Sequence, residues 1–218
     1  MKSREENKLR KRAFIHLSRI DHSRLAIRSS LLVLLLILLV SGCRTEPFAI
    51  APRVDLPPEN FPHVTETTTV RISALPIREE DESFRRFDSN LLLAGVMPVQ
   101  IRIDNQSGAP FSTKSLRFRL VDAQGKEWQR MSPKKASAEQ MKFYEIRNYS
   151  VQGYKNYQEK FMRLCFQADT VLPSPSSSQG IIFFRMPKLN RDFDQTLVLE
   201  VRGDGPLKSG VRVEMRKK

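Results

Sequence analysis

The stretch Val99-Gln100-Ile101-Arg102-Ile103-Asp104 decides the fold of this chain. Apolar β-branched side chains alternate with polar ones, which is the pattern of a strand that buries one face. Asn105-Gln106-Ser107-Gly108 follows, and its composition is typical of a turn. We therefore expect a β-strand within Leu91–Asp104 that ends at a turn.

The same alternation recurs along the chain, between segments rich in Gly, Pro, Ser and Asp. The further strands are expected within Val64–Ile77, Ser115–Val121, Lys126–Gln129, Ile181–Phe184, Leu197–Arg202 and Val211–Arg216. Six or seven short strands with turns between them predict a mainly β chain, folded as an antiparallel, immunoglobulin-like β-sandwich. Trp128 is expected to pack in its core or at a sheet edge, and Ser174–Gly180 to form a loop.

A helical insertion is expected near residues 133–166, because the periodicity changes there. Tyr154, Tyr157, Phe161, Leu164 and Cys165 fall on one face of a helix. Ser137-Ala138-Glu139-Gln140 fits a capping box that begins a helix. Gly153 is expected to separate two short helices. Glu79-Glu80-Asp81-Glu82 is expected to form a charged, solvated loop.

The N-terminal region has the pattern of an export signal. Ten apolar residues, Leu31–Val40, follow a region in which Lys and Arg outnumber Asp and Glu. A positive region, a short apolar region and small residues are typical of secretory leaders. The uncharged stretch Ser29–Cys43 is short for a membrane-spanning helix, which needs roughly 20 apolar residues. The alternative is an uncleaved anchor with the same topology.

Val40-Ser41-Gly42-Cys43 resembles the lipobox of bacterial lipoproteins. The resemblance implies that Cys43 receives lipid, including palmitate, that the chain is cut after Gly42, and that residues 1–42 are a signal peptide. The protein would be exported and held on a membrane by lipid. Arg44 in place of Asp favours the outer membrane, facing the periplasm, in a Gram-negative organism. The pattern from Val96 to Leu120, with the later strand Gly180–Phe184, also resembles sandwich domains of uncharacterised bacterial lipoproteins.

Five prolines within residues 43–63 predict an extended, lipidated spacer before a sandwich domain at residues 64–218. The formal net charge of +13 favours anionic surfaces, although much of it lies in the leader and the rest also suits solubility. The expected partners are membrane lipid through Cys43 and an envelope protein or anionic glycan. Nucleic acid is excluded for an exported chain.

The candidate binding surface lies in the helical insertion. It comprises Lys134, Lys135, Lys142, Arg147, Tyr154, Lys155 and Tyr157. Basic residues interleaved with tyrosines can bind a glycan or lipid. The alternative is an amphipathic insertion whose tyrosines are half-buried and whose lysines extend into water.

No catalytic residue, metal ligand or cofactor is predicted. G-x-S-x-G, H-E-x-x-H, C-x-x-C and phosphate-loop motifs do not occur. After Cys43 the chain has one histidine, His63, and one cysteine, Cys165, whose apolar neighbours indicate a buried structural thiol. The sequence therefore predicts a non-enzymatic binding or assembly module of the cell envelope. The alternative is an envelope hydrolase or transferase with a non-standard active site.

Overall fold

The computed structural model describes residues 46–187 and 195–216. The chain divides into two compact units, and the described residues belong to the second, Thr45–Lys218. The predicted lipidation residue Cys43 and cleavage residue Gly42 lie outside the described residues. Within residues 46–187 and 195–216, no helix has both the length and the apolar character needed to cross a membrane.

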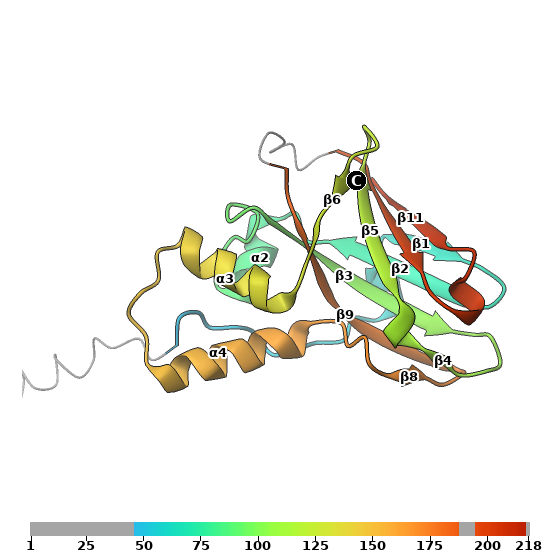
Figure 1. The fold of residues 1–218 in the computed structure, drawn as a ribbon, viewed down its shortest axis with the longest axis horizontal. Helices are drawn as coiled ribbons and strands as arrows, with labels where there is room; N and C mark the ends of the chain where they lie inside the picture. Colours follow the sequence, from blue (N-terminus) through green and yellow to red (C-terminus); the bar gives the residue numbers. More distant parts are fainter. Residues whose placement is uncertain (1–45, 188–194, 217–218) are drawn as a thin grey trace, which may run out of the picture. The chain divides into compact units, whose positions relative to one another are not determined.

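The described unit is mainly β, and its strands pair antiparallel in three sheets (Figure 1). The five-stranded sheet has the order β1 (His63–Glu66), β2 (Val70–Pro76), β3 (Val96–Asn105), β9 (Ser176–Arg185) and β7 (Arg130–Met131). The four-stranded sheet has the order β11 (Val211–Met215), β10 (Leu197–Arg202), β5 (Arg117–Asp122) and β6 (Glu127–Trp128). The third sheet pairs β4 (Phe111–Ser112) with β8 (Val171–Leu172).

The two larger sheets share one hydrophobic core. The five-stranded sheet contributes Ile72, Val99, Ile101, Ile103, Ile182 and Phe184, and the four-stranded sheet contributes Phe118, Leu120, Leu199 and Val213. The chain passes from one sheet to the other between β6 and β7, directly after Trp128. The indole Nε1 of Trp128 donates to Asp122 Oδ2 at 3.2 Å, and the ring is buried in the core. The expected packing role of Trp128 is therefore confirmed.

A layer of helices covers the outer face of the five-stranded sheet (Figure 1). It consists of α2 (Glu80–Phe87), α3 (Pro133–Phe143) and α4 (Val151–Leu164). A second hydrophobic core between these helices and the sheet contains Phe87, Phe161, Ile181 and Phe183. Strand β9 is thus buried on both faces, which explains the uniformly apolar run Ile181–Phe184.

The strands differ from the prediction at several places: the short strands β4, β7 and β8 were not expected, and two expected segments have another structure. The expected strand at Val64–Ile77 is a hairpin, because Thr67 Oγ1 accepts from Val70 N at 3.0 Å and closes a tight turn. The expected loop at Ser174–Gly180 is wrong for Ser176–Gly180, which belong to β9. The backbone of β9, including these serines, pairs antiparallel with β3 along the full length of both strands, up to the pair Ser176 and Asn105. Register with a long partner strand outweighs local turn composition here.

The helix boundaries also differ. The acidic run begins α2 instead of forming a loop, since carboxylates are favoured near the positive end of the helix dipole. Helix α3 begins after Ser132, whose side chain accepts from Lys135 N, so the predicted cap at Ser137 is wrong. Helix α4 begins after Ser150, whose side chain accepts from Gly153 N. Gly153 therefore lies inside α4, and residues 144–150 separate the two helices.

The proline-rich segment does not behave as an unpacked spacer from residue 46 onward. Phe48 is 3% exposed and Ile50 is 6% exposed, and both belong to the core under the helices. Ala51 N donates to Arg86 O at 3.1 Å, and Leu56 N donates to Gln179 Oε1 at 3.0 Å. The prolines of this segment therefore do not keep Phe48 and Ile50 out of the core. The expected domain start at residue 64 therefore does not hold.

Candidate functional site

A buried polar network joins α2, α3 and α4 beneath the predicted binding surface. The hydroxyl of Tyr157 donates to Gln140 Oε1 at 2.8 Å. The amide of Gln140 donates in turn to Phe87 O at 3.0 Å and Ser89 Oγ at 2.7 Å. Burial raises the pKa of the Tyr157 phenol well above its usual range. Tyr157 is fully buried, so its prediction as a surface residue is wrong.

The other tyrosines of this region also take part in packing. Tyr154 is half-buried and stacks on Tyr149, with ring centroids 5.4 Å apart. The hydroxyl of Tyr144 accepts from Asn90 N at 2.9 Å and donates to Asn90 O at 3.1 Å. These contacts tie the α3–α4 connection to the rest of the helical layer. The helical periodicity in the sequence identified the buried face that Tyr157 occupies, but it could not show which hydroxyl would find a partner.

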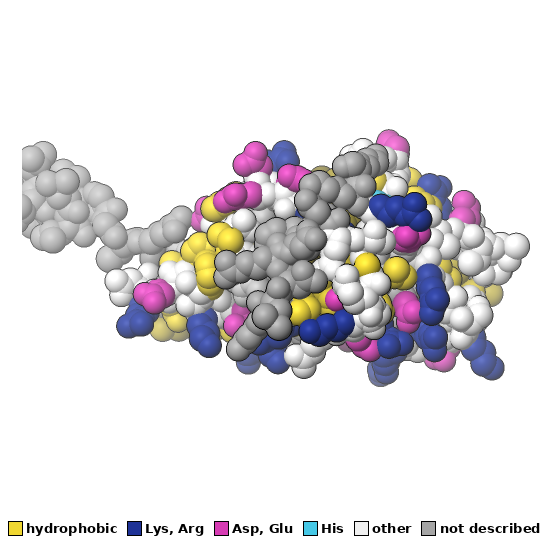
Figure 2. All heavy atoms as spheres, turned by 90° about the horizontal axis from the view of Figure 1, so that it is seen from above, with side chains coloured by type: hydrophobic (Ala, Val, Ile, Leu, Met, Phe, Trp, Pro, Cys, Tyr) yellow, Lys and Arg dark blue, Asp and Glu magenta, His cyan; other side chains and the backbone are white. Residues whose placement is uncertain are grey.

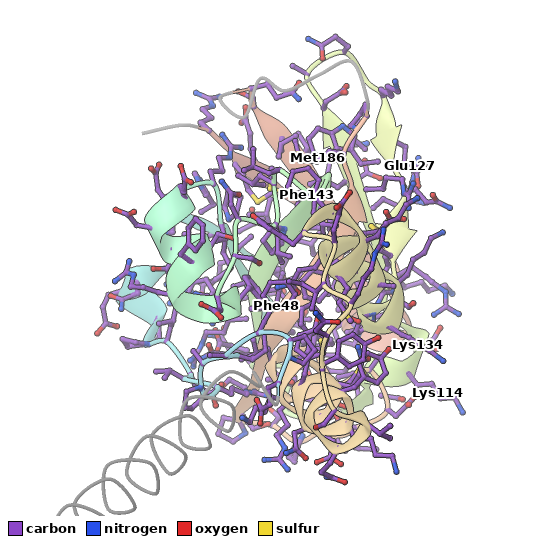
Figure 3. The ribbon with its side chains drawn as sticks, turned by 90° about the vertical axis from the view of Figure 1, so that its left-hand side faces the viewer. Phe48, Lys114, Glu127, Lys134, Phe143 and Met186 are labelled. Atoms are coloured by element: carbon purple, nitrogen blue, oxygen red, sulfur yellow. The ribbon has the colours of Figure 1, made fainter. Side chains whose placement is uncertain are left out.

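The five basic residues of the predicted surface are all exposed: Lys134, Lys135, Lys142, Arg147 and Lys155. None of them forms an ion pair within residues 46–187 and 195–216. In contrast, Lys160 on α4 pairs with Glu46 at 2.7 Å. Figure 2 shows Lys and Arg side chains along one long edge of the molecule. In Figure 3, Lys134 lies toward the edge while Phe48 lies in the interior. The helical layer therefore presents unpaired cations to solvent.

Exposed apolar side chains accompany these cations where α3 is connected to α4. Phe143 is 48% exposed, Tyr149 is 39% exposed and Val151 is 76% exposed. Lys142 and Arg147 lie next to them in the chain. The sequence prediction missed Phe143 and Val151, because residues 143–151 show neither strand alternation nor a continuous helical face. The signal was the density of Phe, Tyr, Ile and Val in a segment that joins two helices.

A hollow of about 230 Å³ lies between residues 51–56, α2 and the outer face of the five-stranded sheet. Its charged side chains are paired with one another. Arg53 Nε contacts Asp55 Oδ1 at 2.9 Å, and Arg86 pairs with Glu82 and donates to Gln100. Its two carboxylates, those of Asp55 and Glu82, are engaged by arginines instead of facing each other.

The thiol of Cys165 is enclosed at the end of α4. Its side chain is buried, and Sγ donates to Phe161 O at 3.2 Å. Burial raises the pKa of the thiol to about 12. A neutral, enclosed thiol is a poor nucleophile. The structure therefore agrees with the expectation of a structural cysteine.

Comparisons with known proteins identify no family for this chain. No family model matches it, and no curated protein matches it significantly. A solved structure described as a functionally unknown protein from Listeria monocytogenes EGD-e is similar to it, with 11% sequence identity and a TM-score of 0.35. The similarity covers 71% of this chain and 82% of that one.

Proposed function

We propose that this chain is a lipid-anchored protein of the bacterial cell envelope and that it acts as a non-enzymatic binding or assembly module. Cys43 carries the lipid, and the protein is exported to the outer membrane, facing the periplasm, if the organism is Gram-negative. The support for the anchor is the lipobox Val40-Ser41-Gly42-Cys43 after a short apolar run. We also propose that the two larger sheets form an immunoglobulin-like sandwich with α3 and α4 as its helical insertion.

The observation that carries the binding role is the set of exposed, unpaired cations on α3, α4 and their connection. Exposed charges without partners add little to stability, whereas together they attract anionic surfaces. Their partner is an envelope protein or an anionic glycan. Buried packing beneath them, through Tyr157 and Gln140, holds the helices in place. The cations therefore lie on helices that are packed against one another and against the sheet.

The proposal is tested by reversing charge at two pairs of lysines. One double variant, Lys134→Glu with Lys135→Glu, removes the cations at the start of α3. The other, Lys142→Glu with Lys155→Glu, removes the cations on either side of the α3–α4 connection. Lys126→Glu with Lys208→Glu is the matched control, because both lysines are exposed in loops of the sheet region. At low salt, recovery of crosslinked partners or of anionic glycan should fall for at least one helical pair and not for the control.

Salt provides a second check on the same variants. The Debye length is about 8 Å at physiological ionic strength and shortens as salt rises, so the difference between helical and control variants should shrink with salt. Equal recovery of all three variants at low salt, with unchanged thermal unfolding, contradicts the binding role. It would direct attention to the hollow beside residues 51–56 and to the alternative of a hydrolase or transferase.

A further inference from the structure

The described chain begins on the helical layer, close to the connection between α3 and α4. Lys160 Nζ donates to Glu46 Oε1 at 2.9 Å and to Oε2 at 2.7 Å. Two residues later, the ring of Phe48 is buried against the rings of Tyr144 and Tyr157, each with centroids 5.8 Å apart. Figure 1 shows this start of the coloured ribbon beside α4, at the end of the unit where α3 and α4 are joined. Residue 46 is therefore held by the fold.

The length of chain outside the described residues limits how far the lipid can be from this position. Two residues, Arg44 and Thr45, lie between Cys43 and Glu46. The three Cα–Cα steps from Cys43 to Glu46 span at most about 11 Å when the chain is fully extended. If Cys43 carries the lipid, as proposed above, the helical end of the unit lies within that reach of the membrane surface. A long spacer, which the prolines in the sequence suggested, is not available, because Phe48 and Ile50 are buried and the backbone of Ala51 and Leu56 is hydrogen-bonded to the unit.

The surface nearest to this position has the chemistry of a membrane interface. It comprises Lys142, Phe143, Arg147, Tyr149, Val151 and Lys155, and we call it the anchor-side surface. Exposed apolar side chains gathered together mark interaction sites, and Tyr is enriched at the level of lipid headgroups. Basic side chains are attracted to anionic headgroups. Glu145 is the one carboxylate within residues 142–155, so the cations predominate there.

We propose that the anchor-side surface rests on anionic lipid headgroups of the membrane that holds Cys43. This inference rests on the proposed lipid anchor and adds an orientation to it. Phe143, Tyr149 and Val151 enter the interface, and Lys142, Arg147 and Lys155 contact headgroup phosphates. The third sheet, β4 with β8, lies at the other end of the unit and faces away from the bilayer (Figure 1). The envelope protein or anionic glycan proposed above then contacts Lys134 and Lys135, at the first turn of α3, while the other three cations contact lipid.

The test places a tryptophan on the anchor-side surface of the full, lipidated chain. Tyr149→Trp is the test variant and Val151→Trp is a second one, in case the first disturbs stacking on Tyr154. Val171→Trp is the control, because Val171 is 65% exposed on β8 at the opposite end. The native tryptophan, Trp128, is buried and is subtracted using the unsubstituted chain. Each protein is purified from membranes and reconstituted in vesicles of phosphatidylglycerol and brominated phosphatidylcholine, whose bromine atoms quench nearby tryptophan.

Quenching at Tyr149→Trp or Val151→Trp should be at least twice that at Val171→Trp. The added pair Lys142→Glu and Lys155→Glu should reduce the quenching, and more so at low salt. If palmitate is incorporated but the three positions are quenched equally or not at all, the anchor-side contact is wrong and the anchor stands. If the chain incorporates no palmitate, the proposed anchor fails, and this inference fails with it.

Discussion

The ring of Phe48 lies edge-on against the ring of Tyr144, with centroids 5.8 Å apart and planes at 74°. This contact joins a residue of the proline-rich segment to the end of α3. It shows that the segment before β1 completes the core under the helices instead of forming a free spacer.

Phe48→Ala should lower the free energy of unfolding by about 3 kcal/mol, because it opens a cavity beside Tyr144 and Tyr157. Val54→Ala is the control, since Val54 is 67% exposed and its loss should change stability by no more than about 0.5 kcal/mol. Urea unfolding followed by circular dichroism measures both. Equal stability of the two variants would mean that residues 46–56 are not part of the cooperative unit.

Tyr157→Phe should lower the free energy of unfolding by roughly 1 to 3 kcal/mol, because Gln140 Oε1 then loses a buried donor. Tyr149→Phe removes the same hydroxyl from a side chain that is 39% exposed, and its effect should be close to zero. Thermal and urea unfolding of the pair give the difference. A larger loss in Tyr149→Phe than in Tyr157→Phe would contradict the placement of the network.

Cys165 should resist thiol reagents in the folded chain. With a pKa of about 12, roughly one thiol in ten thousand is ionised at pH 8, whereas an unfolded chain carries an ordinary, far more reactive thiol. A coloured disulfide reagent should therefore react slowly with the native lipidated protein and rapidly in denaturant. Rapid reaction of one thiol in the native protein would indicate either an open Cys165 or an unmodified Cys43, and Cys165→Ala separates these two explanations.

The same burial predicts how stability depends on pH. The folded state favours the neutral thiol, so its pKa is raised above that of the unfolded chain, near 9. The stabilisation that the folded chain gains by holding this thiol neutral is complete below pH 9, and it is lost as the pH rises from about 9 to about 12. Cys165→Ala should reduce this part of the alkaline decline, which denaturant unfolding at pH 8 and pH 10 can measure.

The sequence predicted the strands best where one face is buried. Phe118 and Leu120 are buried in the sheet core while Arg117 and Arg119 are exposed, as their alternation indicated, whereas Gln100 between Val99 and Ile101 is buried under the helical layer. It failed where tertiary contacts outweigh local composition. The composition of Ser176–Ser178 predicts a loop, yet these residues pair with β3. The prolines around Phe48 and Ile50 predict an unpacked spacer, yet both side chains belong to a core.

The candidate site was predicted less completely. The exposed lysines could be identified because charges on an amphipathic helix face water. Tyr154 and Tyr157 fall on the same predicted helical face, so the sequence could not show that Tyr157 alone would be fully buried, with its hydroxyl bonded to α3. The apolar connection with Phe143 and Val151 has no periodicity, so its exposure depends on where the two helices end.

Labelling cells with palmitate tests the proposed lipid anchor at Cys43. The wild-type chain should carry the label and Cys43→Ser should carry none. That variant should accumulate as uncleaved precursor, because a serine hydroxyl cannot form the thioether. Cys165→Ser is the matched control and should be labelled and cleaved like the wild type. Full labelling of Cys43→Ser would contradict the anchor, and with it the orientation of the helical end toward the membrane.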